Sequence, residues 1–150
     1  MAQLIKFIAS FGYLGYSPFA SGSVASVAGA LMCYFFAGQT CVYIAVFLIV
    51  TALGFMVSGQ MEKIEGKKDP SAVVIDEVAG SFIAFFMLPL SFSVFITAFF
   101  LFRAFDMFKI YPADKLESLG GSYGIMMDDL VAGLYTNIIM QAALRLTGAA

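Results

Sequence analysis

The feature that most constrains the fold is a long stretch without charge, because residues 7–61 include no Asp, Glu, Lys or Arg. A helix that crosses a bilayer needs about 20 mostly apolar residues. The stretch therefore has room for two crossings, and its best turn is Gly-Gln-Thr at residues 38–40. We predict spans at residues 22–37 and 41–58.

The composition agrees with a membrane environment. The chain is 61% hydrophobic and 12% charged, whereas soluble domains are roughly 45–50% apolar and about 25% charged. A domain of 150 residues has too little interior to hide that much apolar surface. We predict an all-α, multi-spanning membrane helical bundle that forms one membrane-embedded domain over residues 1–150. The net charge of −2 indicates no nucleic-acid partner, and the sequence carries no indication of the oligomeric state.

Turn and cap residues divide the rest of the chain into helices. A short interfacial helix at residues 3–11 precedes a segment rich in Gly and Pro. Asp69-Pro70 is a helix-start signal, and we expect a helix at 70–88 that carries Asp76 about two turns from its start. Pro89 favours a hairpin into a return helix at 92–110.

The last predicted helix runs over residues 122–146, with Ser122 as its cap. The prediction thus has about five long helices and a short N-terminal interfacial helix. The hairpin puts nearly all basic residues on one face, which the positive-inside rule makes cytoplasmic: Lys6, Lys63, Lys67, Lys68, Arg103, Lys109 and Lys115. Arg145 lies elsewhere, at the far end of the last helix.

Three clusters on this face could carry chemistry: the pair Asp76-Glu77, the helical set Arg103, Asp106 and Lys109, and the pair Asp128-Asp129. Charges at membrane depth are costly and are normally paired or functional. Gly80 and Gly133 each follow a carboxylate by four residues, and glycine there lets a neighbouring helix approach closely.

The clusters hold more carboxylates than bases, and a divalent cation would balance them. Carboxylate oxygens suit Mg²⁺, so Asp76, Glu77, Asp128 and Asp129 are candidate metal ligands. Arg103 and Lys109 are candidate phosphate contacts. The plainer alternatives are an intrahelical Arg103–Asp106 ion pair and interfacial carboxylates. The chain has no His, which excludes Ser-His-Asp triads and HExxH zinc sites.

The N-terminal turn Ser21-Gly22-Ser23 is a further candidate. Ser21 and Ser23 could bind phosphate at a helix N-terminus, although a plain capping role accounts for them equally well.

Three segments resemble the phosphatidylglycerophosphatase A family of bacterial lipid phosphatases. They are VVIDEVAG at 73–80, FRAFDMFK at 102–109 and GGSYGIMMDDLVAG at 120–133. The chain departs from the family at Ser21-Gly22-Ser23, where Pro-Gly-Thr is usual. It departs again at Lys109-Ile110-Tyr111-Pro112, where Lys-Pro-x-Pro is usual.

The resemblance implies Mg²⁺-dependent hydrolysis of phosphatidylglycerophosphate to phosphatidylglycerol and phosphate at the bacterial cytoplasmic (inner) membrane. The catalytic candidates are then Asp76, Arg103, Asp106, Lys109 and Asp129. Three roles stay open for Asp106: orienting Arg103, general base, or metal ligand. Attack by water and attack by an aspartate also stay open.

Two readings from other classes compete with the phosphatase. A small ion- or proton-coupled transporter would use intramembrane carboxylates, but it predicts access from both sides of the membrane. A non-catalytic membrane subunit would not need three charged clusters.

Overall fold

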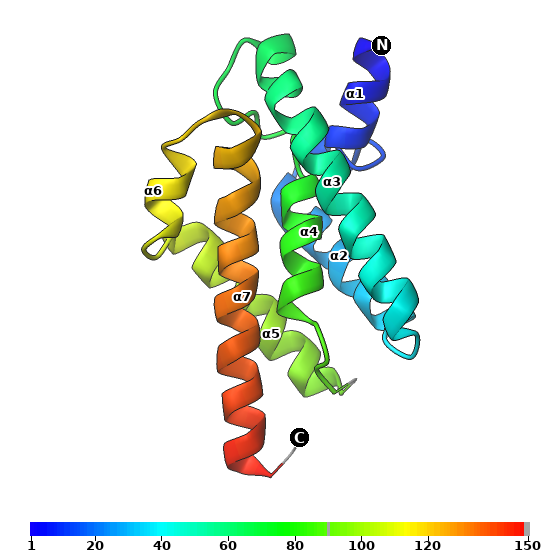
Figure 1. The fold of residues 1–150 in the computed structure, drawn as a ribbon, viewed down its shortest axis with the longest axis vertical. Helices are drawn as coiled ribbons and strands as arrows, with labels where there is room; N and C mark the ends of the chain where they lie inside the picture. The colour runs from blue at the N-terminus through cyan, green and yellow to red at the C-terminus, as the bar shows by residue number, and fades with distance from the viewer. Residues whose placement is uncertain (90, 149–150) are drawn as a thin grey trace.

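The computed structural model describes residues 1–89 and 91–148, and all regular structure within them is helical. The elements are α1 (Ala2–Ala9), the 3-10 turn η1 (Leu14–Tyr16), α2 (Ser21–Phe36), α3 (Thr40–Glu65), α4 (Ile75–Ala84), α5 (Phe92–Phe108), α6 (Ala113–Glu117) and α7 (Gly121–Thr147). Figure 1 shows their arrangement. The all-α prediction is confirmed.

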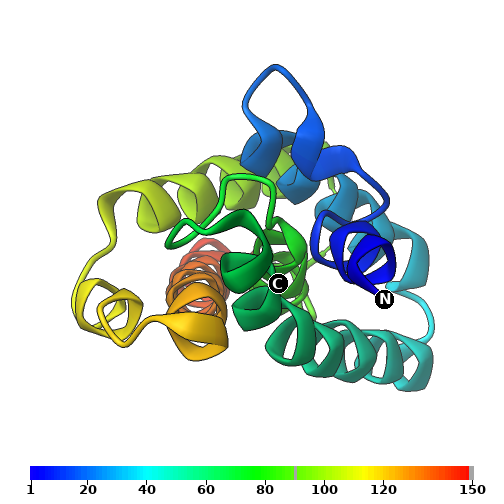
Figure 2. The ribbon, with the colours of Figure 1, turned by 90° about the horizontal axis from the view of Figure 1, so that it is seen from above.

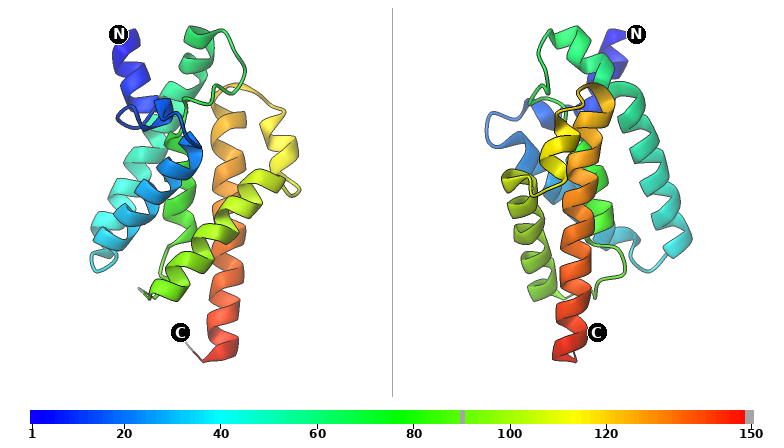
Figure 3. Two further views of the ribbon diagram at one scale, coloured as in Figure 1. Left: turned by 180° about the vertical axis from the view of Figure 1, so that it is seen from behind. Right: turned by 60° about the vertical axis from the view of Figure 1, so that its left-hand side comes forward.

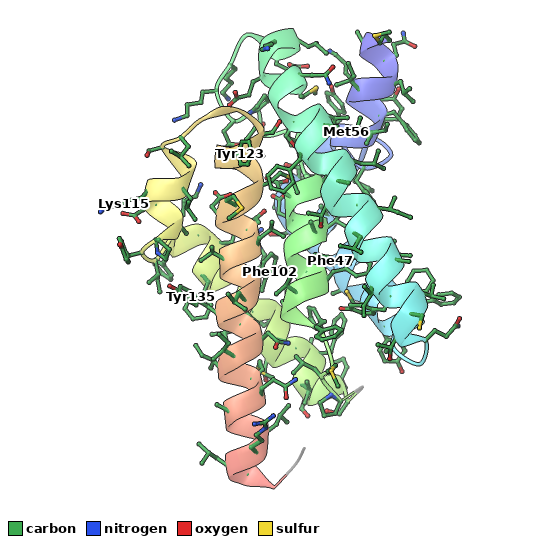
Figure 4. All side chains as sticks on the ribbon, viewed as in Figure 1. Phe47, Met56, Phe102, Lys115, Tyr123 and Tyr135 are labelled. Carbon is green, nitrogen blue, oxygen red and sulfur yellow. The ribbon has the colours of Figure 1, made fainter. Side chains whose placement is uncertain are left out.

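Helix α4 is the centre of the bundle. Seen from above, it is surrounded by α2, α3, α5 and α7 (Figure 2), and eight of its ten residues are buried. Its Phe82 ring packs against Tyr43 of α3 at 5.0 Å between centroids, and Phe102 of α5 lies between α4 and α7 (Figure 4). This position allows α4 to present its side chains to four neighbouring helices.

The prediction of a helix at 70–88 is wrong at both ends, since α4 spans ten residues, Ile75–Ala84. Residues 70–74 instead form a turn, in which the Val73 N–H donates to Pro70 O at 2.8 Å. The Val74 N–H donates to Ala9 O at 3.0 Å. Asp69 has a φ of 46°, and its N–H donates to Glu62 Oε1 at 3.1 Å. Contacts with α1 and α3 therefore override the local helix-start signal.

The carboxyl end of α4 is held by amide side chains of α7. Asn137 Nδ2 donates to Ala84 O at 3.2 Å and to Phe86 O at 2.8 Å. Gln141 Nε2 donates to Met87 O at 3.2 Å. A helix leaves its last carbonyls without intrahelical partners, and non-helical backbone inside a membrane protein needs partners from the protein itself. These two amides supply them.

The other boundaries agree with the predicted segmentation, with three differences. Helix α3 continues to Glu65, α6 was not predicted, and Ser122 is not the cap of α7. The N-cap residue is Gly120, and Ser122 Oγ instead accepts from the Gly59 N–H at 2.8 Å. In Figure 4 Lys115 of α6 points outward, with its Nζ 5.0 Å from the Tyr111 ring centroid.

One helix of the described residues, α3, is long and apolar enough to cross a membrane, with a mean hydropathy of 2.4 over its best window. Only 22% of that window is buried inside the protein, whereas the core helix of a soluble protein is mostly buried. The surface also exposes many large apolar side chains, including Leu31, Phe35, Leu48, Ile49, Phe92, Phe100 and Ile138. The structure thus gives one candidate span, and the multi-spanning arrangement stays a prediction.

The two ends of the bundle carry different parts of the chain. The N-terminus, the end of α3 and the starts of α4 and α7 lie at one end, and the C-terminus lies at the other (Figures 1 and 3). Helices α4 and α5 are separate and run in roughly opposite directions (Figure 1), as the predicted hairpin requires, and its crossing of the membrane stays a prediction. The end that carries the start of α4 is called the α4-start end below.

We expect Asn137→Leu to lower the free energy of unfolding by about 1–3 kcal/mol. The substitution leaves the carbonyl of the buried Ala84 unpaired, and the carbonyl of Phe86 keeps only a 3.4 Å hydrogen bond from Gln141 Nε2. Thermal unfolding of the detergent-solubilised protein measures this. Gln60→Leu is the matched control, since Gln60 is exposed and bonds Met56 O within its own helix. Equal melting temperatures for the two variants would contradict the proposed support of α4.

Candidate active site

Two of the carboxylates belong to the first turn of α4. Asp76 and Glu77 are the second and third residues of the helix, not two turns from its start as predicted. The N-terminal turn of a helix carries partial positive charge, which stabilises carboxylates. The shorter α4 therefore places both side chains where the helix itself favours negative charge.

A third carboxylate, Asp129, reaches the same place from α7. The two helices touch at glycines: a Cβ on Gly133 would collide with Gly80 O, and a Cβ on Gly80 would lie 2.6 Å from Asp129 O. The prediction that Gly80 and Gly133 permit close helix approach is confirmed. The approach brings the main chain of Asp129 directly against α4.

Asp76, Glu77 and Asp129 together form a carboxylate triad. Each offers one oxygen, and these three oxygens lie within 4.8 Å of one another. Asp76 is 7% exposed and Asp129 3% exposed. One oxygen of each triad residue is buried without a hydrogen-bond partner among the described residues: Asp76 Oδ1, Glu77 Oε2 and Asp129 Oδ1.

Buried carboxylates normally have partners, because an unpaired buried charge is very costly. Carboxylate oxygens from three neighbouring side chains are ligands that suit a hard divalent cation. The residues of the triad therefore fit a magnesium ion by their chemistry and by their spacing.

Arg103 of α5 supplies the main positive charge beside the triad. Its Nη1 forms an ion pair with Asp106 Oδ2 and donates to Ser26 Oγ of α2 at 3.3 Å. Its Nε is buried and has no hydrogen-bond partner among the described residues. The guanidinium thus has one nitrogen in contact with protein acceptors and another that is buried without an acceptor among the described residues.

Lys109 and Asp128 form a second pair. Lys109 Nζ lies 3.0 Å from Asp128 Oδ2, and Asp128 Oδ1 accepts from the Asp129 N–H at 3.0 Å. The predicted metal set of four is therefore brought together in part: three residues form the triad, while Asp128 faces Lys109. A ligand role for Asp128 stays a prediction.

Helix α2 forms a wall of the site. Its first three residues were among the candidates from the sequence, but Ser26 and Gly29 were missed. A Cβ on Gly22 would collide with Glu77 Oε1 and would lie 3.4 Å from Arg103 Nη1. Ser26 follows one turn later and is fully buried, and a Cβ on Gly29 would lie 2.9 Å from Ser81 Cβ of α4. Small residues at i, i+4 and i+7 permit close helix packing, and this spacing was the available signal.

The two serines predicted to bind phosphate flank this wall. Ser21 Oγ donates to Ser71 O at 2.9 Å, which ties the start of α2 to the turn before α4. Ser23 is half-buried near the start of the same helix. Substrate binding by Ser21 and Ser23 stays a prediction.

Glu62 of α3 is a further residue without a signal in the sequence. Its Oε2 accepts from the Gly121 N–H at 3.0 Å and its Oε1 from the Asp69 N–H at 3.1 Å. One carboxylate thereby connects the end of α3 to the start of α7 and to the loop before α4. Its role is to hold together the backbone segments that carry the triad.

We expect Gly133→Ala to lower the free energy of unfolding by about 1–3 kcal/mol, because the added methyl group forces α7 away from α4. Gly38→Ala is the control, since a Cβ there meets nothing within 4 Å. Thermal unfolding in detergent measures both variants. A Gly133→Ala protein as stable as Gly38→Ala would show that α4 and α7 are not in tight contact.

Comparisons with known proteins identify the family of the chain. The family model described as phosphatidylglycerophosphatase A matches residues 7–144. A Bacteroides thetaiotaomicron protein, named as a provisional phosphatidylinositol-3-phosphatase, is 33% identical over 138 residues, which cover 86% of this chain and 86% of that protein.

Two relatives carry the name of the family itself. Phosphatidylglycerophosphatase A of Haemophilus influenzae is 37% identical over 105 residues, which are 66% of this chain and 64% of the relative. The Escherichia coli protein of that name is 32% identical over 125 residues, or 80% and 72%. No solved structure matches the chain. The family model covers all three charged clusters, and the chain belongs to the phosphatidylglycerophosphatase A family of phosphatases.

Proposed function

We propose that the chain hydrolyses phosphatidylglycerophosphate to phosphatidylglycerol and inorganic phosphate, with Mg²⁺ as its cofactor. The single observation that carries this proposal is the triad of buried carboxylates beside a guanidinium with an unpaired Nε. Two relatives bear the name of this activity. The triad suits a divalent cation and the guanidinium suits a phosphate monoester. The site therefore offers a metal-binding group and a phosphate-binding group, as a metal-dependent phosphatase needs.

Asp76, Glu77 and Asp129 are the residues we propose as magnesium ligands. When bound, the ion supplies Lewis-acid polarisation of a phosphoryl oxygen. The close contact of α4 and α7 at Gly80 and Gly133 keeps the triad assembled, so the ligands need little rearrangement on binding.

Arg103 and Lys109 are proposed to bind the terminal phosphate. Both side chains are positively charged. They would neutralise the negative charge on the phosphoryl oxygens in the transition state. Asp106 is proposed to orient Arg103, which its ion pair with Nη1 supports. In the net reaction water adds to phosphorus, the phosphorus–oxygen bond to glycerol breaks, and the glycerol oxygen takes up a proton.

The location that follows for the enzyme is the bacterial inner membrane, crossed more than once, with the α4-start end facing the cytoplasm. The apolar α3 and the exposed apolar surface support contact with lipid. The basic loop with Lys67 and Lys68 directly follows α3 at this end, which the positive-inside rule favours for the cytoplasmic side. A lipid headgroup would then lie level with the triad.

The ion-coupled transporter is not favoured. The carboxylates lie toward the α4-start end of the bundle, and the chain belongs to a phosphatase family. A transporter would instead place ionisable groups where both sides of the membrane can reach them.

Purified protein in detergent is expected to release phosphate from phosphatidylglycerophosphate, and EDTA is expected to abolish the release until Mg²⁺ is restored. Asp76→Asn and Asp129→Asn should each lower kcat/KM by about 100-fold or more, because each removes a charged ligand from the triad. A phosphate-release assay measures this.

Asp114→Asn is the matched control, since Asp114 is an exposed carboxylate of α6, and it should leave the rate unchanged. A folded Asp76→Asn or Asp129→Asn protein with full activity would contradict the assignment of these residues as metal ligands. Activity that persists in EDTA would contradict the magnesium dependence.

The orientation has its own test through thiol labelling. Cys41 is exposed and lies at the start of α3, at the end of the bundle away from the triad. A membrane-impermeant maleimide should label Cys41 in intact spheroplasts. It should label Lys67→Cys, in a Cys41→Ser background, only after permeabilisation. The reverse pattern would contradict a cytoplasmic active site.

A further inference from the structure

Ser26 of α2 makes contact with the proposed phosphate-binding group. We propose that Ser26 is a positioning residue, whose hydroxyl fixes the Arg103 guanidinium so that its Nε edge is left to bind the substrate phosphate. This inference rests on the proposed function and adds α2 to the site. Neither the family match nor the sequence motifs point to this residue.

The direction of the hydrogen bond follows from counting protons. A serine hydroxyl has one donor and two acceptor positions. Ser26 Oγ donates its proton to Gly22 O at 2.8 Å, so toward Arg103 Nη1, at 3.3 Å, it acts as an acceptor. Because Ser26 is fully buried, no water competes for this position.

The remaining donors of Arg103 follow from the same count. A guanidinium has five N–H groups, of which two are on Nη1. Ser26 Oγ accepts from one of these, and Asp106 Oδ2 forms an ion pair with the same nitrogen. The three left over are on Nε and Nη2, and Nε is buried without a partner among the described residues. Since the guanidinium is planar, fixing Nη1 from two sides also fixes the plane in which Nε points.

The place where Ser26 acts is also the place where Arg103 approaches the triad. At Gly22 the two groups meet, since a Cβ there would collide with Glu77 Oε1 and lie 3.4 Å from Arg103 Nη1. Ser26 is one helical turn further along α2. An anion that bridges the triad and Arg103 would therefore depend on the orientation that Ser26 imposes.

Ser81 of α4 provides a matched control. It is also fully buried at the contact of α2 and α4, and its Oγ donates to Glu77 O at 2.7 Å and lies 3.4 Å from Ser26 O. It makes no hydrogen bond with Arg103 in the described part of the chain. Ser81→Ala also removes a serine hydroxyl from the interface of α2 and α4. It leaves the hydrogen bond between Ser26 and the Arg103 guanidinium in place.

The test compares Ser26→Ala with Ser81→Ala in two assays. The first is the KM and kcat of phosphatidylglycerophosphate hydrolysis, and the second is calorimetric binding of inorganic phosphate. We expect Ser26→Ala to raise KM and to weaken phosphate binding by about tenfold each, as loss of one hydrogen bond to a charged group should, with kcat changed by less than about twofold. Ser81→Ala should change neither constant.

Two further variants keep the test decisive. In an Arg103→Gln background, Ser26→Ala should cause no additional loss, because the group that it positions is gone. Ser26→Thr keeps the hydroxyl and should restore both constants. If Ser26→Ala does not fold, Ser26→Cys replaces it with the same expectation, because sulfur is a poor acceptor.

A purely structural role would give a different pattern. It would lower kcat at unchanged KM, because fewer molecules would be folded, and it would affect Ser26→Ala and Ser81→Ala alike. Either result, or an equal loss in the Arg103→Gln background, would overturn the proposal. A wild-type protein that binds phosphate but does not hydrolyse the lipid would defeat the proposed function, while the phosphate assay would still decide the role of Ser26.

Discussion

The close contact between α4 and α7 is the constraint on which the site depends. Gly80 and Gly133 bring the two backbones together so closely that a single methyl group would separate them. This contact places Asp129 beside Asp76 and Glu77 in a region that water scarcely reaches. Mutual repulsion of three carboxylates opposes such an arrangement, and the packing of the two helices holds it in place.

The central helix is also short. At ten residues and 1.5 Å per residue, α4 is about half as long as the hydrocarbon layer is thick. Both ends of α4 lie inside the protein. Glu62 and Ala9 hold the loop that enters it, and Asn137 and Gln141 bind the carbonyls at its exit. In a helix that crosses the whole membrane, most backbone polar groups bond within that helix. At the ends of α4, side chains from distant parts of the chain bond these groups instead.

The residues that could be predicted from the sequence are those whose chemistry is unusual for their surroundings. Charged residues stand out in an apolar chain, so the sequence alone indicates Asp76, Glu77, Arg103 and Asp129 as candidates. The start of α4 could not be predicted, because the strong local signal at Asp69-Pro70 was overridden by a backbone hydrogen bond to Ala9. Ser26 and Glu62 were missed for a related reason. A serine and a glutamate near the end of a helix are ordinary residues, and only their partners in space make them informative.

The long sequence separation of the partners of α4 has a consequence for the order in which the molecule can form. The Val74 N–H finds its partner in Ala9, already synthesised, whereas Ala84 and Phe86 wait for Asn137, more than fifty residues later. Before α7 is made, the preceding part of the chain can hold the start of α4 through Ala9, while the carbonyls at the end of α4 lack their amide partners. Helix α7 then supplies the partners for these carbonyls and brings Asp129 to Asp76 and Glu77 in the same step, so the carboxylate triad is completed only when α7 has packed against α4.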